Sequence, residues 1–406
     1  MIDIKLIREK KALVKKGLKS RGVDPKIIDD FLELDDQWRE LTTKLDRFRS
    51  EQKQLGKERK ITKAKAIKKK IQAHQAKLMG LVDLRKDLLN RIPNLPLSST
   101  LKGKGERDNK VLREVGKKPN FKFDAKDYLS IAEDLDMIDM KRGAKVAGSR
   151  FGYLKNDAVL LELSLINYAF DLLTPKGFIP VLPPAMIKPH VFEGMGRLAA
   201  DQKDERYYLP NDDLYLIGSA EHTIGPMHRD EILEEDQLPI RYVGFSPSFR
   251  REAGSYGKDT KGILRVHQFD KVEMFSFCKP EDSEKEHQFL LSLQEKIMKG
   301  LKLPYRVVEI CAGDLGWTDA QQFDIETWLP AQGVYKETHS ASNTTDFQAR
   351  GTNVRFKRKK GQELEYVHML NATGLAMGRT IVALIENNQT KAGEIKIPAV
   401  LKKGRC

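Results

Sequence analysis

Arginine, carboxylate and aromatic side chains recur at alternate positions within residues 249–273, FRREAGSYGKDTKGILRVHQFDKVE. This stretch is typical of two strands joined by a polar, glycine-rich loop, and alternate side chains of a strand share one face. Alternation predicts Arg250 with Glu252 on one face of the first strand, and Arg265 with Phe269 and Glu273 on one face of the second. Guanidinium groups suit phosphate or carboxylate oxygens, and an aromatic face suits a base. We therefore interpret this stretch as a nucleotide site on an antiparallel sheet.

Three further segments, 218–222, 337–343 and 371–379, concentrate charged and small polar residues. Each is weak evidence alone, but other kinds of site have less support. The chain has no Gly-x-x-x-x-Gly-Lys-Ser/Thr run that would cradle phosphates. His222 and His228 lack the spacing of a helical zinc pair, and no cysteine lies near them. We expect no zinc, and we expect the eight histidines to form hydrogen bonds rather than bind metal.

The composition indicates a globular protein of more than one domain. A chain of 406 residues with 40% apolar residues exceeds a usual single domain and can bury a sizeable core. The three cysteines, Cys278, Cys311 and Cys406, are few and far apart, which favours a reducing compartment over a disulfide framework. The first residues contain no apolar signal core, and no uninterrupted apolar run reaches membrane-spanning length. We expect a cytoplasmic protein with no membrane partner.

The positive charge lies in the first quarter of the chain. Residues 1–110 contain 30 Lys and Arg against 16 Asp and Glu, whereas the remainder contains 42 of each. Residues 2–22 are expected to form a short helix. Two heptad series follow, and together they predict an antiparallel helical hairpin over about 27–92. Their seam residues are Phe31, Leu34, Trp38, Leu41, Leu45, Phe48, Gln52 and Leu55, then Ala64, Ile67, Ile71, His74, Leu78, Leu81, Arg85, Leu88 and Ile92.

Basic residues gather around the tip of this hairpin. They include Lys53, Lys57, Arg59, Lys60 and Lys63. A solvated coiled-coil surface is the ordinary interpretation of such a cluster. Because the excess has one sign and lies at the end of a projecting arm, we favour contact with a nucleic-acid backbone, most simply RNA.

The remainder is expected to be an α+β body that begins after a linker over 93–120. Apolar periodicity predicts a core helix over 160–173 and a strand in 177–187 that ends at Pro183 and Pro184. We also expect a buried strand at 306–312, a strand pair at 323–329 and 333–340, and a helix from Gly374 to about Asn388. The predicted domains are therefore 1–110 and 111–406.

At these segments the chain resembles the seryl-tRNA synthetases, class II enzymes, of the bacterial, zinc-independent type. The resemblance covers nearly the whole chain, including the basic hairpin. FRREAGSYGKDTKGILRVHQFDKVEMF is similar to the second class II motif, NATGLAMGRTIVALIENNQ to the third, and VAGSRFGYLKNDAVLLELSLINYAFDLL with GFIPVLPP to the region of the first. TWLPAQGVYKETHSASNTTDFQAR resembles a further block of that family.

The resemblance implies a tRNA-binding hairpin joined to a class II catalytic domain, in which helices flank a central antiparallel sheet and which dimerises through the first motif. It implies that L-serine is activated by ATP with Mg²⁺, then transferred to the terminal ribose of tRNA(Ser), and often also to tRNA(Sec). The resemblance implies catalytic roles for Arg250, Arg265 and Arg379.

The resemblance also assigns individual residues to each substrate. ATP would be bound by Arg250, Arg251, Glu252, Val266, Phe269, Glu337, Thr338, His339, Ser340 and Arg379, with Mg²⁺ on Glu337 and Ser340. Serine would be bound by Ser219, Ala220, Glu221, Arg250, Glu273, Asn371 and Thr373. The tRNA contacts would be Lys53, Lys57, Arg59, Lys60 and Lys63 on the arm, and Lys258 and Lys261 in the loop of the second motif.

The chain departs from the family pattern at Ser219, where threonine is common, at Arg251, where a small residue is usual, and at Ala341, where cysteine is frequent. None of these departures removes a charge that the chemistry requires. Two other readings stay open: a synthetase-like RNA-binding paralogue with altered catalysis, and an amino-acid ligase that acts on a carrier protein. The second would have no use for a long basic hairpin.

Overall fold

The computed structural model describes the whole chain except residues 200–201, 253–260, 360–362 and 403–406. The chain divides into two compact units, Met1–Leu95 and Pro96–Cys406. The boundary precedes the predicted one at 110, and it falls inside the segment predicted as a linker. The reason is that strand β1 (Lys110–Val115) pairs into the sheet of the second unit.

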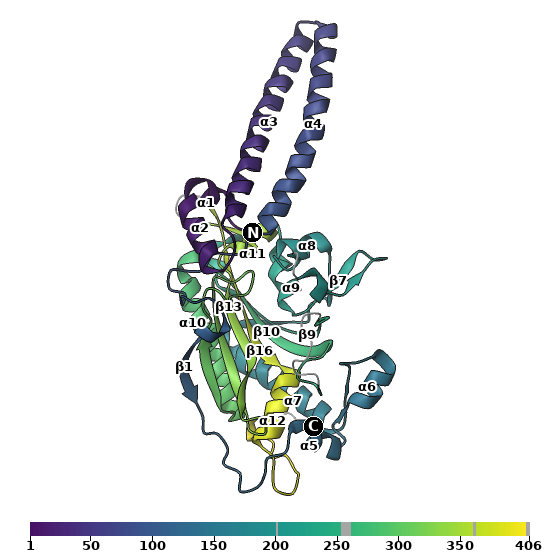
Figure 1. Cartoon of the computed structure of the whole chain (residues 1–406), viewed down its shortest axis with the longest axis vertical. Coiled ribbons are helices and arrows are strands. Elements are labelled where there is room, and N and C mark those ends of the chain that lie inside the picture. The colour runs from purple at the N-terminus through teal and green to yellow at the C-terminus, as the bar shows by residue number, and fades with distance from the viewer. Residues whose placement is uncertain (200–201, 253–260, 360–362, 403–406) are drawn as a thin grey trace. The chain divides into compact units, whose positions relative to one another are not determined.

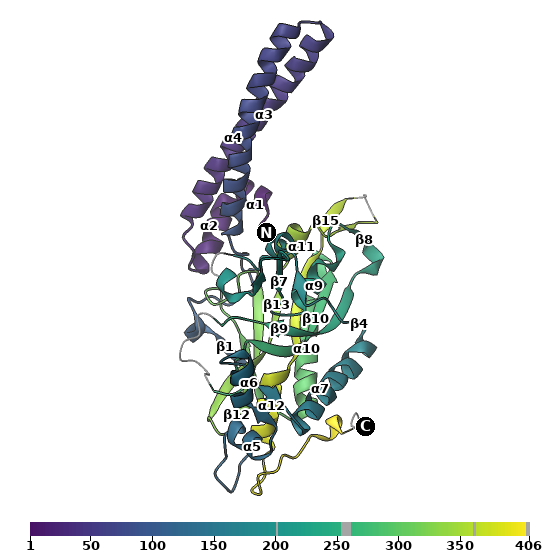
Figure 2. The same cartoon turned by 90° about the vertical axis from the view of Figure 1, so that its right-hand side faces the viewer.

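The first unit is built on two long antiparallel helices, α3 (Lys26–Lys57) and α4 (Ile61–Asn90), which run side by side in both views (Figures 1 and 2). The heptad prediction is confirmed, because Leu45, Ile67 and Ile71 are buried between them. The single helix predicted over 2–22 is two short helices, α1 (Ile4–Glu9) and α2 (Lys11–Ser20).

A buried carboxylate joins α1 to the hairpin. Asp35 is fully buried on α3. Arg8 of α1 donates to it through Nε at 2.7 Å and Nη2 at 2.9 Å, and Arg85 of α4 donates through Nε at 2.7 Å. The Arg85 guanidinium also lies over the rings of Trp38 (4.8 Å) and Phe31 (5.5 Å). The polar residue at this point of the seam therefore has a buried ionic partner that the heptad pattern did not indicate.

The second unit is organised around an eight-stranded sheet in the order β1-β11-β12-β13-β16-β10-β9-β4. Every neighbouring pair is antiparallel except β4 and β9, which are parallel, so the predicted antiparallel sheet is confirmed with one parallel strand added at its edge. The strands after β1 are β4 (Phe178–Val181), β9 (Ile240–Phe249), β10 (Gln268–Cys278), β11 (Tyr305–Glu309), β12 (Gln321–Leu329), β13 (Val334–Asn343) and β16 (His368–Ala376).

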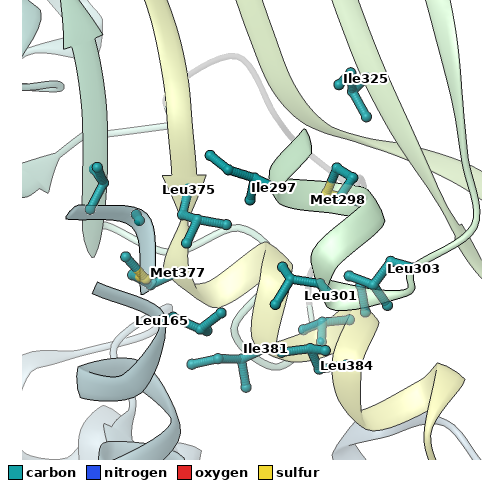
Figure 3. Packing of buried hydrophobic residues seen from close by; sticks show 14 of the residues in the cluster. Leu165, Ile297, Met298, Leu301, Leu303, Ile325, Leu375, Met377, Ile381 and Leu384 are labelled. Carbon is teal, nitrogen blue, oxygen red and sulfur yellow. The ribbon is translucent and has the colours of Figure 1, made fainter. Parts of the chain in front are cut away.

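Three helices pack against this sheet: α7 (Asp157–Leu173), α10 (Ser283–Leu301) and α12 (Met377–Asn387). They contribute much of the main hydrophobic core, as Figure 3 shows for Leu165, Met298 and Ile381 beside Leu375 of β16. The core helix predicted at 160–173 and the strand pair at 323–329 and 333–340 are confirmed. The helix predicted from Gly374 begins only at Met377, because β16 continues through Ala376.

Shorter elements surround the sheet (Figure 2). They form three small sheets: β2 (Ile138–Asp139) with β3 (Tyr153–Leu154); β5 (Met186–Ile187), β7 (Leu214–Leu216) and β6 (Tyr208–Leu209); and β15 (Leu364–Tyr366), β14 (Arg355–Lys357) and β8 (Ile232–Glu234). The remaining α-helices are α5 (Tyr128–Asp134), α6 (Met140–Ala147), α8 (Pro189–Gly194), α9 (Glu221–Ile224) and α11 (Phe347–Thr352).

Helix α7 is apolar on both faces. By length and composition, Asp157–Lys176 could cross a membrane, but core helices of soluble proteins pass the same test. One face of α7 lies in the main core. On the opposite face Val159, Leu160 and Leu163 are exposed, by 40%, 50% and 53%. This second face is an apolar surface that needs an explanation.

The Asp35 cluster leads to a stability prediction. Burial raises the pKa of the Asp35 carboxyl, but hydrogen bonds and charges from Arg8 and Arg85 outweigh burial and lower it overall. Asp35→Asn removes a charge that two partly exposed arginines require, and should destabilise the first unit by about 1–3 kcal/mol. Hydrogen exchange of α1 and the base of α3 in the full chain measures this loss, with Asp36→Asn on the exposed face as control.

The same cluster gives a pH dependence. Because the folded pKa of Asp35 is lowered, its stabilising contribution is present above the unfolded value of about 3.9 and is lost as pH falls through the folded value. Equal hydrogen-exchange protection of α1 in Asp35→Asn and Asp36→Asn at neutral pH would contradict the role assigned to Asp35.

Candidate active site

Strand β10 separates the hydrophobic core from a polar surface. Val272 and Met274 point into the main core with α7 and α12. The alternate residues Phe269, Lys271 and Glu273 point to the other face, where the same strand continues into a second apolar cluster. Side chains alternate along a strand, so one element carries both the core and the polar floor.

The predicted faces are partly wrong, because the strands are shorter than the stretch that carries the charges. β9 ends at Phe249 and β10 begins at Gln268, so Arg250, Glu252 and Arg265 lie in the connection between the strands. The connection still brings them together. The backbone N–H of Arg250 donates to the His267 carbonyl at 2.9 Å, and Arg265 forms an ion pair with Glu252, whose φ of +53° is in the left-handed region.

A pocket of about 110 Å³ opens beside these residues. It draws its lining from the β9–β10 connection, β10, β13, β16 and the first turn of α12. The lining residues are Arg250, Glu252, Ile263, Leu264, Arg265, Val266, Phe269, Lys271, Glu337, Thr338, Ser340, Thr373, Ala376, Gly378 and Arg379. Three of the segments singled out by sequence therefore meet in one cavity, and we call it the charged pocket.

Arg250 connects this pocket to the turn at 218–222. Its guanidinium lies 5.2 Å from the centre of the Phe269 ring, and its Nε and Nη2 both donate to the Gly218 carbonyl at 3.2 Å. Burial lowers the pKa of Arg250, and the neighbouring Arg379 charge lowers it further. This arrangement favours an anion at the junction.

The turn at 218–222 contains a buried ionic cluster. Glu221 is buried and forms an ion pair with Arg197 at 2.5 Å. Burial raises the pKa of Glu221, but Arg197 and His222 outweigh burial and lower it strongly. Burial lowers the pKa of His222 to about 3, so this ring is neutral. Its Nδ1 accepts the Gly218 N–H at 3.0 Å, and its Nε2 lies 3.3 Å from Glu221.

A second buried pair lies on β10. Lys271 and Glu273 are an ion pair, and both side chains are at least nine-tenths buried. The Lys271 ammonium also donates to the Ser219 hydroxyl at 3.3 Å. Burial raises the pKa of Glu273, and the Lys271 charge opposes that rise without cancelling it. Ser219, Glu221 and Glu273 therefore surround one small polar region next to Arg250.

A bulge in β16 completes this region. Opposite Val272 and Glu273 the pairing register shifts, with Leu375 and Thr373 as partners, so Gly374 is the extra residue. A Cβ at Gly374 would lie 2.9 Å from Val272 Cγ1, so only glycine fits there without a shift. Asn371 and Thr373 are buried on the floor, and Asn371 Nδ2 has no hydrogen-bond partner among the described residues.

Strand β13 places its predicted residues in different environments. Glu337 and Ser340 line the charged pocket. Arg379 of α12 donates to the Glu337 carbonyl at 2.9 Å and pairs with its carboxylate at 3.1 Å. Thr338 reaches the lining, but its hydroxyl is hydrogen-bonded to Thr327 at 2.7 Å. His339 is buried outside the pocket, and burial lowers its pKa to about 3.

Carboxylates next to Glu337 and Ser340 fit a hard cation. Glu326 is paired directly across the strands from Glu337, and Asp324 from Ser340. Burial raises the pKa of Asp324 well above its usual range, and the neighbouring Glu337 charge raises it further. Among the described residues no group of three His, Cys, Asp or Glu is arranged to hold a metal by itself. Oxygen donors that provide only part of a coordination shell suit Mg²⁺ shared with phosphates.

The other predicted residues lie apart from the pocket. Arg251 is exposed over the Tyr207 ring at 6.0 Å, and Ala220 is buried in the second apolar cluster. Lys261 is exposed at the edge of the connection, whereas Lys258 lies outside the described residues. The five basic arm residues are all exposed around the α3–α4 connection; they are Lys53, Lys57, Arg59, Lys60 and Lys63.

Three buried basic residues of the site were not predicted. Lys271 had a sequence signal, because it alternates with Phe269 and Glu273. Arg197 and Arg206 had none, since they lie in irregular segments far from the four motifs. Burial, with the charges of Arg250 and Arg197, lowers the pKa of Arg206 to about 9. The guanidinium groups of Arg197, Arg206 and Arg250 together increase the positive potential around Gly218.

Comparisons with known proteins agree with this geometry. Residues 1–96 match the family model of the seryl-tRNA synthetase N-terminal domain, and residues 206–388 match the class II tRNA synthetase core domain (G, H, P, S and T). A serine–tRNA ligase of Dictyoglomus thermophilum is 44% identical over 99% of this chain and 97% of its own length. The chain belongs to the serine–tRNA ligase family.

Solved structures of this family share the whole architecture. The seryl-tRNA synthetase of Pyrococcus horikoshii, complexed with ATP, has a TM-score of 0.91 and 41% identity, covering 99% of this chain and 98% of that one. The cytoplasmic serine–tRNA ligase of Naegleria fowleri, in complex with AMP, has a TM-score of 0.87 and 33% identity, covering 99% and 97%. The fold and the family prediction are thus confirmed, and this serine–tRNA ligase family member is an ATP-dependent ligase.

Proposed function

We propose that this chain activates L-serine with ATP to seryl-adenylate and transfers the seryl group to tRNA(Ser). The observation that carries the proposal is the position of Arg250. Its guanidinium contacts the aromatic wall of the charged pocket and the turn that holds Ser219 and Glu221. An α-phosphate and an amino-acid carboxylate must meet at such a junction, and one guanidinium can bind both.

The charged pocket provides the nucleotide side of the proposed site. Phe269 and Arg379 would enclose the adenine ring, Glu252 would accept its amino group, and Arg265 would bind the γ-phosphate. In the structure Arg265 is paired with Glu252, and Arg379 with Glu337. Arg379 and Glu337 are both partly exposed, so ATP can replace this ion pair at small cost. Glu252 is only 9% exposed, so the adenine amino group would have to take the place of Arg265 there. Bound Mg²⁺ would lie on Glu337 and Ser340, where it would neutralise phosphate charge.

The polar region around Ser219 provides the serine side. Glu273, whose carboxylate is held by Lys271, would bind the substrate serine. The ammonium and hydroxyl groups of that serine would be surrounded by Ser219, Glu221, Asn371 and Thr373. A site that hydrogen-bonds a substrate hydroxyl rejects the analogue that lacks it, because its buried polar groups would then be unpaired. Alanine is excluded on that ground, and threonine by size.

The proposed chemistry has two steps. A serine carboxylate oxygen attacks the α-phosphorus of ATP, and pyrophosphate leaves with its bonding electrons. A ribose hydroxyl at the tRNA 3′ end then attacks the seryl carbonyl, and AMP leaves. Both steps require alignment and charge stabilisation more than a strong base. Arg250 and Arg265 would provide that charge, while neutral His222 would orient the turn through its hydrogen bond from the Gly218 N–H.

We propose that the basic arm binds the tRNA backbone. Lys53, Lys57 and Lys63 are exposed near its tip, and contacts to phosphates and shape would recognise tRNA without reading many bases. Lys258 and Lys261 would contact the acceptor end. The proposal extends to tRNA(Sec) if that tRNA shares the recognised shape, and the location that suits these substrates is the cytoplasm.

We also propose a homodimer. Besides the exposed apolar face of α7, Ile179 of β4 and Leu182 in the same unit are exposed by 51% and 78%. A cavity of about 600 Å³ lined largely by apolar side chains lies along the same face, between α6, α7 and β10. A second copy of the chain is the occupant that matches an apolar face of this extent.

An altered paralogue without catalysis is the second candidate, but nothing favours it. Such a protein would have lost at least one charged group that binds ATP. Arg250, Glu252, Arg265, Glu337 and Arg379 all line one pocket.

Serine-dependent ATP–pyrophosphate exchange tests the first step, and charging of tRNA(Ser) and tRNA(Sec) transcripts tests the second. We expect exchange with serine to exceed exchange with alanine by roughly 10⁴-fold. Exchange with alanine or glycine above that with serine would refute the specificity. Full exchange with no tRNA charging would favour a different acceptor.

Deletion of Lys44–Lys77 tests the arm. This deletion removes the basic end of the hairpin and leaves the second unit intact. We expect exchange within about twofold of the full chain and tRNA charging reduced by at least roughly a hundredfold, because several phosphate contacts are lost. Replacing Lys53, Lys57 and Lys63 with glutamine in the intact arm is the matched control for gross misfolding, and it should reduce charging in the same direction. Equal loss of exchange and charging would show that the arm is not specific to tRNA.

Leu163→Glu tests the dimer, because Leu163 is on the exposed face of α7 and outside the main core. Sedimentation velocity at micromolar concentration should give a dimer for the original chain and a monomer for the variant. The matched control is Val111→Glu on β1, also an exposed apolar residue, which should stay dimeric. A monomeric original chain would rule out the proposed dimer.

A further inference from the structure

A tyrosine outside the predicted motifs contacts the wall of the charged pocket. Helix α5 begins after Asp127, whose carboxylate accepts the N–H groups of Leu129 and Ser130. This cap fixes Tyr128 at the first position of the helix, where its side chain is buried. The hydroxyl accepts the Ile263 N–H at 2.9 Å and donates to the Lys261 carbonyl at 3.2 Å.

The hydroxyl also packs on the residue between these two partners. Gly262 has a φ of +67°, and a Cβ there would lie 1.9 Å from the Tyr128 oxygen. Only glycine has both this backbone conformation and this space. Tyr128 therefore holds three consecutive backbone positions, 261–263, in one conformation.

The segment that follows forms one side of the charged pocket. Residues 263–266 all line it, and Ile263 with Val266 also lines the larger apolar cavity on the other side. The first turn of α12 supports the same wall, since a Cβ at Gly378 would lie 3.0 Å from the Ile263 carbonyl. The position of residues 263–266 thus depends on contacts from α5 and α12.

We propose that Tyr128 is a positioning residue for nucleotide binding, acting through residues 261–266. The proposal rests on the proposed function, because it takes the charged pocket as the ATP site. Tyr128 does not line that pocket. Burial raises the pKa of Tyr128 to about 12, so its hydroxyl stays protonated and both hydrogen bonds persist at neutral pH.

If Tyr128 had only a structural role, loss of its hydroxyl would lower stability without weakening the binding of one substrate more than the other. Positioning predicts a selective effect, because residues 263–266 line the charged pocket, whereas Ser219 and Glu273 are held by Lys271, and Glu221 by Arg197. Loss of the hydroxyl should therefore weaken ATP binding and leave serine binding unchanged.

Tyr128→Phe removes the hydroxyl and keeps the ring in the core. Tyr168→Phe is the matched control. Tyr168 on α7 is a tyrosine whose hydroxyl donates to the Ile297 carbonyl at 3.3 Å and packs on Gly300, away from the charged pocket. Serine-dependent ATP–pyrophosphate exchange would be measured with ATP varied at saturating serine, then with serine varied at saturating ATP.

We expect Tyr128→Phe to raise the KM for ATP roughly fivefold, about the value of one or two hydrogen bonds, with the KM for serine within twofold. Hydrogen exchange at the Ile263 amide should also accelerate, which is a readout independent of activity. Tyr168→Phe should change neither KM.

An unchanged KM for ATP in an active Tyr128→Phe protein would overturn the inference. So would equal increases in both KM values, or the same KM change in Tyr168→Phe. If Tyr128→Phe is too unstable for the kinetic assay, hydrogen exchange below its melting temperature replaces that assay. An Ile263 amide that exchanges no faster there than in the original chain would also overturn the inference. Absence of exchange activity in the original chain would instead count against the proposed function.

Discussion

Side-chain alternation along β10 is the constraint on which the site depends. Val272 and Met274 are in the core while Lys271 and Glu273 are on the polar floor, so the residues that hold the unit together also set the spacing of the charges. A slip of one residue against β9 or β16 would move an ion pair into the apolar core. The cost of that error makes the register well determined. The bulge at Gly374 shifts the register of β16 against β10, so that Asn371 and Thr373 lie on the polar floor while Leu375 lies in the core.

One buried carboxylate in each unit is compensated by nearby arginine. Asp35 has two arginines in the first unit, and Glu221 has Arg197 in the second. The carboxylates of Asp35 and Glu221 are themselves buried, so loss of their arginine partners would leave an unpaired charge in a low dielectric. The pair of Arg379 with Glu337 is partly exposed on both sides, by 31% and 50%. Partners at that position are easily replaced by a charged ligand, so the distinction between scaffold and binding group follows from burial.

The two units differ in how their charges are arranged. The first unit contains most of the basic excess of the chain, with 26 Lys and Arg against 14 Asp and Glu in residues 1–95, and an apolar seam packs its two long helices together. The second unit, residues 96–406, is nearly neutral, with 46 Lys and Arg against 44 Asp and Glu, but it concentrates guanidinium groups beside one turn and carboxylates beside one strand pair. Under the proposed function, phosphate-rich substrates would be attracted at two places for different reasons, by diffuse charge on the arm and by directed hydrogen bonds in the pocket.

Local periodicity determined much of this protein. The heptad seam, the apolar helix α7 and the paired strands β12 and β13 follow from the sequence, because the spacing of apolar residues shows which face of each element is buried. The four polar segments also indicated most of the pocket once their resemblance to a family was recognised. The strand limits were harder to predict, because the charged residues of the nucleotide stretch are polar enough for a strand face or a connection.

Only the tertiary structure decided which distant groups meet. Asp35 is 50 residues from Arg85, and Tyr128 is 135 residues from Ile263, so no local pattern links them. The same holds for Arg197 and Glu221, and for the bulge that makes Gly374 necessary. A sequence pattern records which face of an element is apolar, whereas the pairing of buried polar groups depends on how elements far apart in the chain pack together.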